Sequence, residues 1–227
     1  MFARRSVFGA VLGLAFLGLA GCGGSSGGDA VSPDDMVLGN ANAPVTMIEY
    51  ASATCPHCAQ FHADNFEQLK TQYIDTGRVR LIFREYPTPP PAVAVAGFQL
   101  ARCGGATPEQ YFARLGEIFR QQRAMFATGT MEGVRQKLFE IGASAGLSQD
   151  QVMACINDEA GANRVNRTVE AGERQYHITG TPTIIINGAK QEDPSIVTWE
   201  GLSHALDAAG AGSAGGAASS GSAAPHP

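Results

Sequence analysis

Two cysteines separated by two residues, Cys55 and Cys58, follow directly on a short apolar run rich in β-forming residues, at residues 45–50. After the pair, residues suited to a buried face recur at steps of three and four up to Tyr73, the period of an amphipathic helix. The pair therefore lies where a strand ends and a helix begins. This feature constrains the fold most, because both sulfurs must sit at one junction between a strand and a helix N-terminus.

The neighbouring segments extend this junction into an α/β pattern. A second strand is predicted at residues 79–83, so strand, helix and strand form a unit with a parallel strand pair. A cluster of prolines within residues 87–91 then stops both helix and strand. Further on, residues 183–186 and the dipeptide Asn187-Gly188 predict a hairpin with a tight turn. A last helix is predicted to begin after Thr198.

Between these two parts, every periodic stretch from Ala92 to about Tyr176 is helical. Three helix starts are marked by side chains that can cap an N-terminus, namely Thr107, Thr130 and Ser148. Thr107 and Ser148 each have a glutamine three residues later, which completes a capping box. The sequence therefore predicts an α/β domain that is interrupted by an all-helical insertion.

The spacing of Cys55 and Cys58 is typical of a redox-active pair. A zinc site, a haem attachment site and a structural disulfide are the three alternatives. A tetrahedral zinc site needs four ligands, and Cys103 and Cys155 give no second close pair. Haem attachment needs a histidine directly after the second cysteine, where this chain has Ala59. A purely structural disulfide across two residues would contribute little loop-closure entropy. Redox chemistry is therefore our main hypothesis.

The start of the helix favours the thiolate form of Cys55. Unpaired backbone N–H groups and the helix dipole stabilise negative charge there, and His57 adds a cation or hydrogen-bond donor. A stabilised thiolate favours the reduced cysteine pair over its disulfide. The disulfide form should therefore oxidise other thiols readily. Cys58 would point back into the helix as the buried partner that closes or resolves the bond. Pro56 lies between them at the first helical position.

The N-terminal residues predict export. Two arginines precede an apolar run over residues 7–20, which is shorter than the roughly 20 residues that a membrane-spanning helix needs. The run ends in Leu19-Ala20-Gly21-Cys22, which resembles the bacterial lipobox. We therefore expect a signal peptide at residues 1–21, lipidation of Cys22 and a flexible tether at residues 22–33. An ordinary cleavage site beside a cysteine is the alternative.

Charge and composition restrict the partners. The 227 residues include 16 Lys and Arg against 21 Asp and Glu, a formal net charge of −5. This acidic balance offers no basic surface to neutralise phosphates, so nucleic acid is not expected as a partner. The Gly/Ala/Ser-rich segment at residues 210–227 cannot bury enough apolar surface to offset its ordering entropy. We therefore expect a disordered tail there.

Three features together resemble the DsbA family of thiol-disulfide oxidoreductases. They are Cys55-Pro56-His57-Cys58 after the first central strand, the helical insertion, and Gly180-Thr181-Pro182-Thr183 before the hairpin. The resemblance implies an α/β, thioredoxin-like fold with an inserted all-helical domain. It implies that Pro182 is cis and faces the redox pair, with Thr181 offering backbone hydrogen bonds to a bound substrate strand. The implied domains are a thioredoxin-like domain at 34–91 and 177–209, and a helical insertion at 92–176.

The resemblance also suggests roles for further residues. Glu49, six residues before Cys55, matches a buried carboxylate beneath the redox pair that is thought to assist proton movement. A solvated strand glutamate is the alternative. Cys103 and Cys155 lie in the helical insertion, where some relatives carry a second disulfide, and an oxidising compartment favours their pairing. Two buried free cysteines that pack as small hydrophobes are the alternative.

The function implied is that of an extracytoplasmic thiol oxidase, lipid-anchored on the periplasmic side of a bacterial membrane. It would donate the Cys55–Cys58 disulfide to reduced or unfolded exported proteins, and a quinone-linked membrane partner of the DsbB type would reoxidise it. No metal or organic cofactor is implied. Thr181 stands where the enterobacterial oxidase has valine, which leaves the balance between oxidation and isomerisation open. A disulfide isomerase or reductase, and a non-catalytic lipoprotein that binds extended peptides, remain alternatives.

Overall fold

The computed structural model describes residues 30–212, and its framework is a five-stranded sheet of order β1-β3-β2-β4-β5. The strands are β1 (Met36–Leu38), β2 (Val45–Ala51), β3 (Val79–Glu85), β4 (Thr183–Ile186) and β5 (Ala189–Lys190). β2 and β3 are parallel, as predicted, and the other neighbouring pairs are antiparallel. β1 was not predicted, because three residues are too short to show a strand period.

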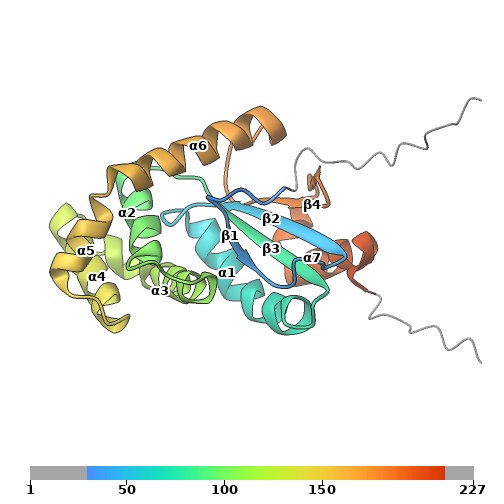
Figure 1. Ribbon diagram of the computed structural model, residues 1–227, viewed down its shortest axis with the longest axis horizontal. Helices are drawn as coiled ribbons and strands as arrows, with labels where there is room; N and C mark the ends of the chain where they lie inside the picture. The colour runs from blue at the N-terminus through green and yellow to red at the C-terminus, as the bar shows by residue number, and fades with distance from the viewer. Residues whose placement is uncertain (1–29, 213–227) are drawn as a thin grey trace, which may run out of the picture.

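The helices divide into two groups (Figure 1). In the first group α1 (Pro56–Leu69) and its π-helical extension η1 (Lys70–Ile74) connect β2 to β3. The chain end adds η2 (Pro194–Val197), α7 (Trp199–Leu206) and η3 (Asp207–Ala211) to this group. The second group forms a lobe beside the sheet, with α2 (Pro91–Arg102), α3 (Pro108–Phe126), α4 (Met131–Ser144), α5 (Gln149–Ile156) and α6 (Glu159–Tyr176). The α/β class and the all-helical stretch are as predicted.

The predicted helix starts are confirmed at atomic level. Thr107 and Ser148 each form a complete capping box with the glutamine three residues later. Thr130 and Thr198 each accept a hydrogen bond from a backbone N–H three residues on, at 3.1 and 3.2 Å. The predicted hairpin turn is also present, since Asn187 and Gly188 both have positive φ between β4 and β5. These features depend on neighbours along the chain, which is why the pattern predicted them.

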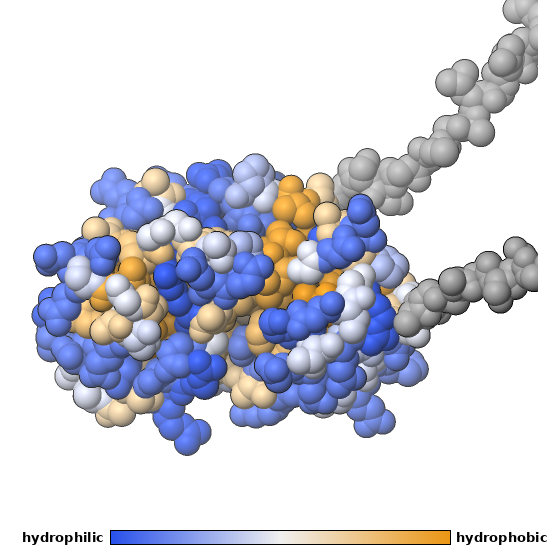
Figure 2. Space-filling view, turned by 60° about the horizontal axis from the view of Figure 1, so that its bottom comes forward, coloured by the Kyte–Doolittle hydropathy of each residue, from blue (hydrophilic) through white to orange (hydrophobic). Residues whose placement is uncertain are grey.

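The sheet separates two apolar clusters, because side chains along a strand alternate between its faces. From β2, Val45, Met47 and Ala51 join the larger cluster with α1, α3 and α7, whereas Ile48 and Tyr50 join a smaller one on the other face. The redox cysteines belong to the larger cluster. The surface turned to the viewer in Figure 2 is mainly hydrophilic, with a hydrophobic strip to the right of its middle and smaller hydrophobic areas on the left.

A buried ionic cluster attaches the helical lobe to the end of the sheet. Glu85, the last residue of β3, is 1% exposed. Its carboxylate accepts hydrogen bonds from Arg102 of α2 at 2.7 Å and from the Tyr111 hydroxyl of α3 at 3.0 Å. Arg164 of α6 lies 3.8 Å from the second carboxylate oxygen. Because removing one partner would leave a buried charge uncompensated, this cluster holds three helices in a defined position.

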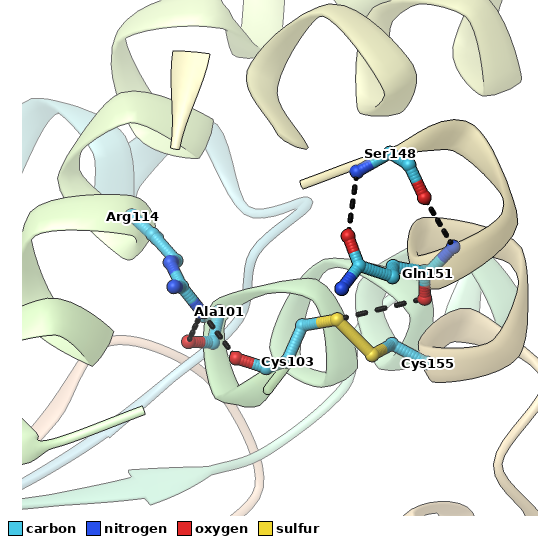
Figure 3. Close-up of a disulfide and its surroundings, with 6 residues drawn as sticks. All are labelled: Ala101, Cys103, Arg114, Ser148, Gln151 and Cys155. Atoms are coloured by element: carbon cyan, nitrogen blue, oxygen red, sulfur yellow. Dashed lines mark hydrogen bonds between the residues drawn. A yellow bond between two sulfur atoms is a disulfide. The ribbon is translucent and has the colours of Figure 1, made fainter. Parts of the chain in front are cut away.

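A disulfide joins two helices within the lobe (Figure 3). Cys103 at the end of α2 is bonded to Cys155 of α5, with a Cα–Cα distance of 5.5 Å. Arg114 of α3 donates to the Cys103 carbonyl at 2.5 Å, so a third helix contacts the same point. The capping box of Ser148 and Gln151 begins the helix that carries Cys155. The bond therefore links segments that are distant in sequence at the periphery of the lobe.

The two ends of the described chain make specific contacts with the rest of the domain. The Ala30 carbonyl, within the predicted tether, accepts a hydrogen bond from Arg84, whose guanidinium also pairs with Asp35 at 3.0 Å. Near the other end η3 continues to a fully buried Ala211, inside the predicted tail. The predicted signal peptide, Cys22 and residues 213–227 lie outside the described residues. Within residues 30–212 no helix is both long and apolar enough to cross a membrane.

Candidate active site

The two cysteines of the Cys-x-x-Cys motif lie at the first turn of α1. Cys55 is the N-cap residue, in an extended backbone conformation, and Pro56 occupies the first helical position. Proline suits this position because its fixed φ matches the helix and it needs no hydrogen-bond acceptor. No side chain caps the helix. The free backbone N–H groups of the first turn are therefore available to a negatively charged sulfur.

The two thiols have opposite environments, and both are free in the structure. Cys55 is 7% exposed, and a hydrogen bond from Cys58, helped by backbone N–H groups of His57 and Cys58, lowers the pKa of its thiol to about 5 against the effect of burial. Cys58 is fully buried, and this burial raises the pKa of its thiol far above the usual range. At neutral pH Cys55 is therefore a thiolate and Cys58 a thiol.

The cis-proline loop faces the reactive sulfur. The Thr181–Pro182 peptide bond is cis, and the Cys55 sulfur lies 3.3 Å from the Thr181 carbonyl oxygen, to which Cys55 can donate only when it is protonated. Pro56 and His57 are exposed beside it. The structure thus brings together Cys55, Pro56, His57, Thr181 and Pro182, from two segments more than a hundred residues apart. A substrate sulfur can approach Cys55 between the helix N-terminus and this loop.

Glu49 is buried rather than solvated. It lies in the middle of β2 and is 2% exposed, and its Oε1 has no hydrogen-bond partner among the described residues. Burial raises the pKa of this carboxyl to about 8, so it is mainly protonated at neutral pH. Strand alternation places it with Met47 and Ala51 on the sheet face of the cluster that contains Cys58. Glu49 is the single acidic residue of β2. Because its pKa is near neutral pH, its carboxyl group can donate a proton and its carboxylate can accept one.

A network of hydroxyl groups holds the loop before the motif. Ser52 is fully buried, and its backbone N–H points to the Cys58 sulfur at 3.5 Å. Its hydroxyl accepts hydrogen bonds from the backbone N–H groups of Thr54 and Thr88, at 3.3 and 3.0 Å. A role for these residues was not predicted. Serine and threonine are common in loops, and no sequence signal shows that two loops share one hydroxyl group.

Gln122 of α3 is a further residue at the site whose role was not predicted. It is 6% exposed, and its side-chain amide donates to the carbonyls of Ala53 at 2.9 Å and Cys55 at 3.2 Å. The helical lobe thereby contacts the backbone of the nucleophile directly. Buried polar groups are almost always paired, yet the sequence does not reveal which glutamine of an amphipathic helix is buried.

A metal centre finds no support in the described part of the chain. Across residues 30–212 no three His, Cys, Asp or Glu side chains lie close enough to hold an ion. Of the sequence-predicted site residues, Cys103 and Cys155 lie in the disulfide of the lobe, away from the motif. The candidate active site is therefore made of thiols, a buried carboxyl group and backbone groups.

Comparisons with known proteins agree with this geometry. The thioredoxin family matches residues 31–208. A Rickettsia typhi protein that carries the name protein-disulfide oxidoreductase is 32% identical over 79% of this chain. The chain spans 63% of the length of that relative. Disulfide bond formation protein D of Bacillus subtilis is 24% identical over 71% of this chain and 73% of its own.

Solved structures show the same architecture. Wolbachia pipientis α-DsbA1 aligns with a TM-score of 0.68 and 27% identity, over 78% of this chain and 92% of its own. Bacillus subtilis BdbD, in the oxidised form, aligns with a TM-score of 0.66 and 19% identity, over 80% of this chain and 96% of its own. These matches confirm the thioredoxin-like fold with an inserted helical domain. The chain therefore belongs to the thioredoxin family, and its architecture is similar to that of Wolbachia pipientis α-DsbA1.

Proposed function

We propose that this protein is a thiol oxidase that donates the Cys55–Cys58 disulfide to reduced proteins. The observation that carries the proposal is the opposite displacement of the two pKa values, with Cys55 lowered to about 5 and Cys58 raised. A stabilised Cys55 thiolate favours the dithiol form of the enzyme over its disulfide. The disulfide form is therefore a strong oxidant. The relatives named as protein-disulfide oxidoreductases support the same class of reaction.

In the first step a substrate thiolate attacks the sulfur of Cys55. The Cys55–Cys58 bond breaks, and its electron pair leaves on Cys58, whose thiolate is unfavourable in its buried position. Glu49, with its pKa raised to about 8, is mainly protonated at neutral pH, and in this proposal it supplies the proton that makes Cys58 a thiol. The product is a mixed disulfide between substrate and Cys55.

In the second step another substrate thiolate attacks the substrate sulfur of the mixed disulfide. The electron pair leaves on Cys55, which is a good leaving group because its pKa is low. The substrate has lost two electrons and gained a disulfide, and the enzyme holds the Cys55 thiolate and the Cys58 thiol. The carbonyl of Thr181 and the cis peptide before Pro182 border the sulfur during both steps.

The cellular setting is proposed from the N-terminal sequence. An export signal at residues 1–21 and a lipid on Cys22 would place the catalytic domain on the periplasmic side of a bacterial membrane. There, exported proteins with reduced cysteines would be the substrates, and a DsbB-type membrane partner would return the dithiol to the disulfide. Mass spectrometry of the mature N-terminus tests this setting. We expect a diacylglyceryl group on Cys22, and an unmodified terminus downstream of Cys22 would overturn it.

The central experiment measures the reduction potential of the Cys55–Cys58 pair against glutathione. We expect a value nearer to that of strongly oxidising DsbA, about −120 mV, than to that of thioredoxin, about −270 mV. Oxidation of a reduced dithiol peptide should accompany it and should be lost in Cys55→Ser. A potential near that of thioredoxin would contradict the oxidase proposal. Efficient repair of a protein with scrambled disulfides, exceeding dithiol oxidation, would instead favour an isomerase.

A further inference from the structure

Ser52, the residue that follows β2, contacts both redox cysteines through its backbone. Its N–H points to the Cys58 sulfur at 3.5 Å. Its carbonyl accepts a hydrogen bond from the backbone N–H of Cys55 at 3.1 Å, which closes the turn that leads into the motif. The mechanism above gives Ser52 no role, although one residue joins the attacked sulfur and the departing sulfur.

Cys58 carries the charge that the first step creates. When a substrate thiolate attacks Cys55, the bond between the two sulfurs breaks and its electron pair leaves on Cys58. Cys58 is fully buried, so bulk water does not solvate the new thiolate. Burial and the hydrogen bond to Cys55 raise the pKa of this thiol, whereas the Thr181 side chain and the Ser52 N–H lower it. Donors from the protein therefore have to replace the missing water.

The Ser52 hydroxyl is the centre of a hydrogen-bond network that holds this residue. It accepts from the backbone N–H groups of Thr54 and Thr88 at 3.3 and 3.0 Å, and from the Thr88 hydroxyl at 2.9 Å. The Thr54 hydroxyl lies 3.1 Å from it and donates its own proton to the Thr88 carbonyl at 2.9 Å. Ser52 therefore donates to Thr54, and each of the three hydroxyl protons has an acceptor.

This network fixes Ser52 against a second loop. Ser52 is fully buried and Thr54 is 6% exposed, so water does not compete for these hydrogen bonds. Thr88 is half-buried and lies in the loop between β3 and α2. A donor that is held in place before charge develops stabilises that charge without reorganisation. The N–H of Ser52 meets this condition at the Cys58 sulfur.

We propose that the Ser52 N–H stabilises the thiolate that forms on Cys58 when the disulfide opens. The hydroxyl groups of Thr54 and Thr88 are positioning groups that hold the donor. This inference rests on the proposed oxidase function and adds a residue to its first step. The donor acts on charge that is absent from the disulfide, so it lowers the barrier to opening. The electron pair stays on Cys58 until a proton reaches it.

The test compares the two steps of the reaction in the full-length protein, with dithiothreitol as the attacking thiol. The first step, in which Cys58 leaves, is followed as loss of the Cys55–Cys58 disulfide after acid quench and alkylation. The second step, in which Cys55 leaves, is isolated in Cys58→Ala as removal of glutathione from a Cys55–glutathione disulfide. Charge develops on Cys58 in the first step alone, so the ratio of the two rates reports on the donor.

Two variants loosen the network, and one control matches them. Ser52→Ala removes the hydroxyl and retains the N–H, and we expect the first rate to fall about tenfold, the scale of a hydrogen bond to a charged group. Thr88→Val removes one donor to Ser52 and should slow the first step by a smaller factor. Both should leave the second rate unchanged. Ser148→Ala, which removes a hydroxyl that binds a backbone N–H at the start of α5, should change neither rate.

An ester analogue tests the N–H itself. Cell-free synthesis places the α-hydroxy analogue of serine at position 52, so that an ester oxygen replaces the N–H and the side chain is kept. We expect the first rate to fall at least as much as in Ser52→Ala, because the donor is lost rather than loosened. The second rate should again stay unchanged.

The outcomes separate the donor from the oxidase function. Slower opening with an unchanged second step supports the donor even if the reduction potential is close to that of thioredoxin, which would count against the oxidase alone. Equal slowing of both steps would show a purely structural role for Ser52 and overturn the inference. A first rate that the ester analogue leaves unchanged would also overturn it while the oxidase function stands. If Ser52→Ala does not fold, the half-buried Thr88→Val decides between these outcomes.

Discussion

The two cysteine pairs of the described chain differ in their position and in their surroundings. Cys55 and Cys58 lie in one helical turn, close to a loop from the far end of the chain, and hold thiols of opposite acidity. Cys103 and Cys155 are 52 residues apart, join two helices of the inserted lobe and form a disulfide. The first pair is placed where a thiolate is stabilised, and the second where it closes a long loop.

This difference shows that the same bond can serve chemistry or stability. A disulfide stabilises a fold mainly by restricting the unfolded chain, so its contribution grows with the length of the loop that it closes. The loop between Cys55 and Cys58 is too short for such a contribution, and the helix N-terminus favours its reduced form. We therefore expect substitutions around the first pair to change its thiol chemistry, and loss of the second pair to lower the free energy of unfolding.

The largest effect is expected from Glu49, the buried acid of β2. Above pH 4.5 an unfolded Glu49 loses its proton, whereas the folded protein retains it up to about pH 8. The folded state then binds more protons than the unfolded state, so stability falls as pH rises through this interval. Since one pKa unit corresponds to about 1.4 kcal/mol, the loss is on the order of 5 kcal/mol. Glu49→Gln should abolish this loss.

Urea unfolding of the oxidised protein at pH 4.5 and pH 8 measures this effect, because the cysteines do not titrate in the oxidised form. The relevant quantity is the change in unfolding free energy between the two pH values, compared between native protein and variant. Glu67→Gln, at an exposed position on the same helix as Cys58, is the control and should retain the native change. Equal changes in the native protein and in Glu49→Gln would show that Glu49 titrates normally.

The second effect concerns the lobe. Replacing both Cys103 and Cys155 by alanine should lower the free energy of unfolding by roughly 4 kcal/mol, the chain-entropy value for a loop of this length. Urea denaturation measures the loss, and oxidation of dithiothreitol by the folded variant should persist. The comparison experiment selectively reduces the Cys55–Cys58 disulfide in the native protein. We expect this reduction to increase the free energy of unfolding. A stability loss of similar size in both experiments would remove the distinction between the pairs.

The smallest effect concerns the contact between lobe and active site. Gln122→Leu removes the amide that holds the carbonyls of Ala53 and Cys55. We expect the Cys55 pKa to rise by less than about one unit, since a single hydrogen bond contributes about 1 kcal/mol. The pH dependence of Cys55 alkylation measures it. Gln99→Leu, which removes an equally buried amide that donates to the Asp158 carbonyl, should leave the Cys55 pKa unchanged.

Sequence patterns predicted the features that depend on near neighbours. The motif at residues 55–58, the capping residues Thr107 and Ser148 and the turn at Asn187-Gly188 are each read from a few consecutive positions. The strand–helix–strand unit and the helical insertion follow from periodicity over longer windows. These signals sufficed for the α/β class and, through the resemblance to a known family, for the thioredoxin-like fold.

Other features emerged only from contacts between distant segments. The cluster around Glu85 gathers two arginines and one tyrosine hydroxyl from three helices, and nothing near Glu85 in the sequence distinguishes it from a surface glutamate. The edge strand β1 exists because it pairs with β3. In each case the contacting residues are far apart along the chain, so the local sequence does not reveal the contact.

The redox motif itself shows both kinds of information. The sequence by itself determined that Cys55 stands at a helix N-terminus, because strand period, proline and helix period meet at that point. Only the tertiary structure decided that Glu49 is buried, that Gln122 holds the Cys55 backbone and that Thr181 faces its sulfur. The physical reason is that helix formation is local, whereas burial and the pKa values that follow from it depend on which distant segments exclude water.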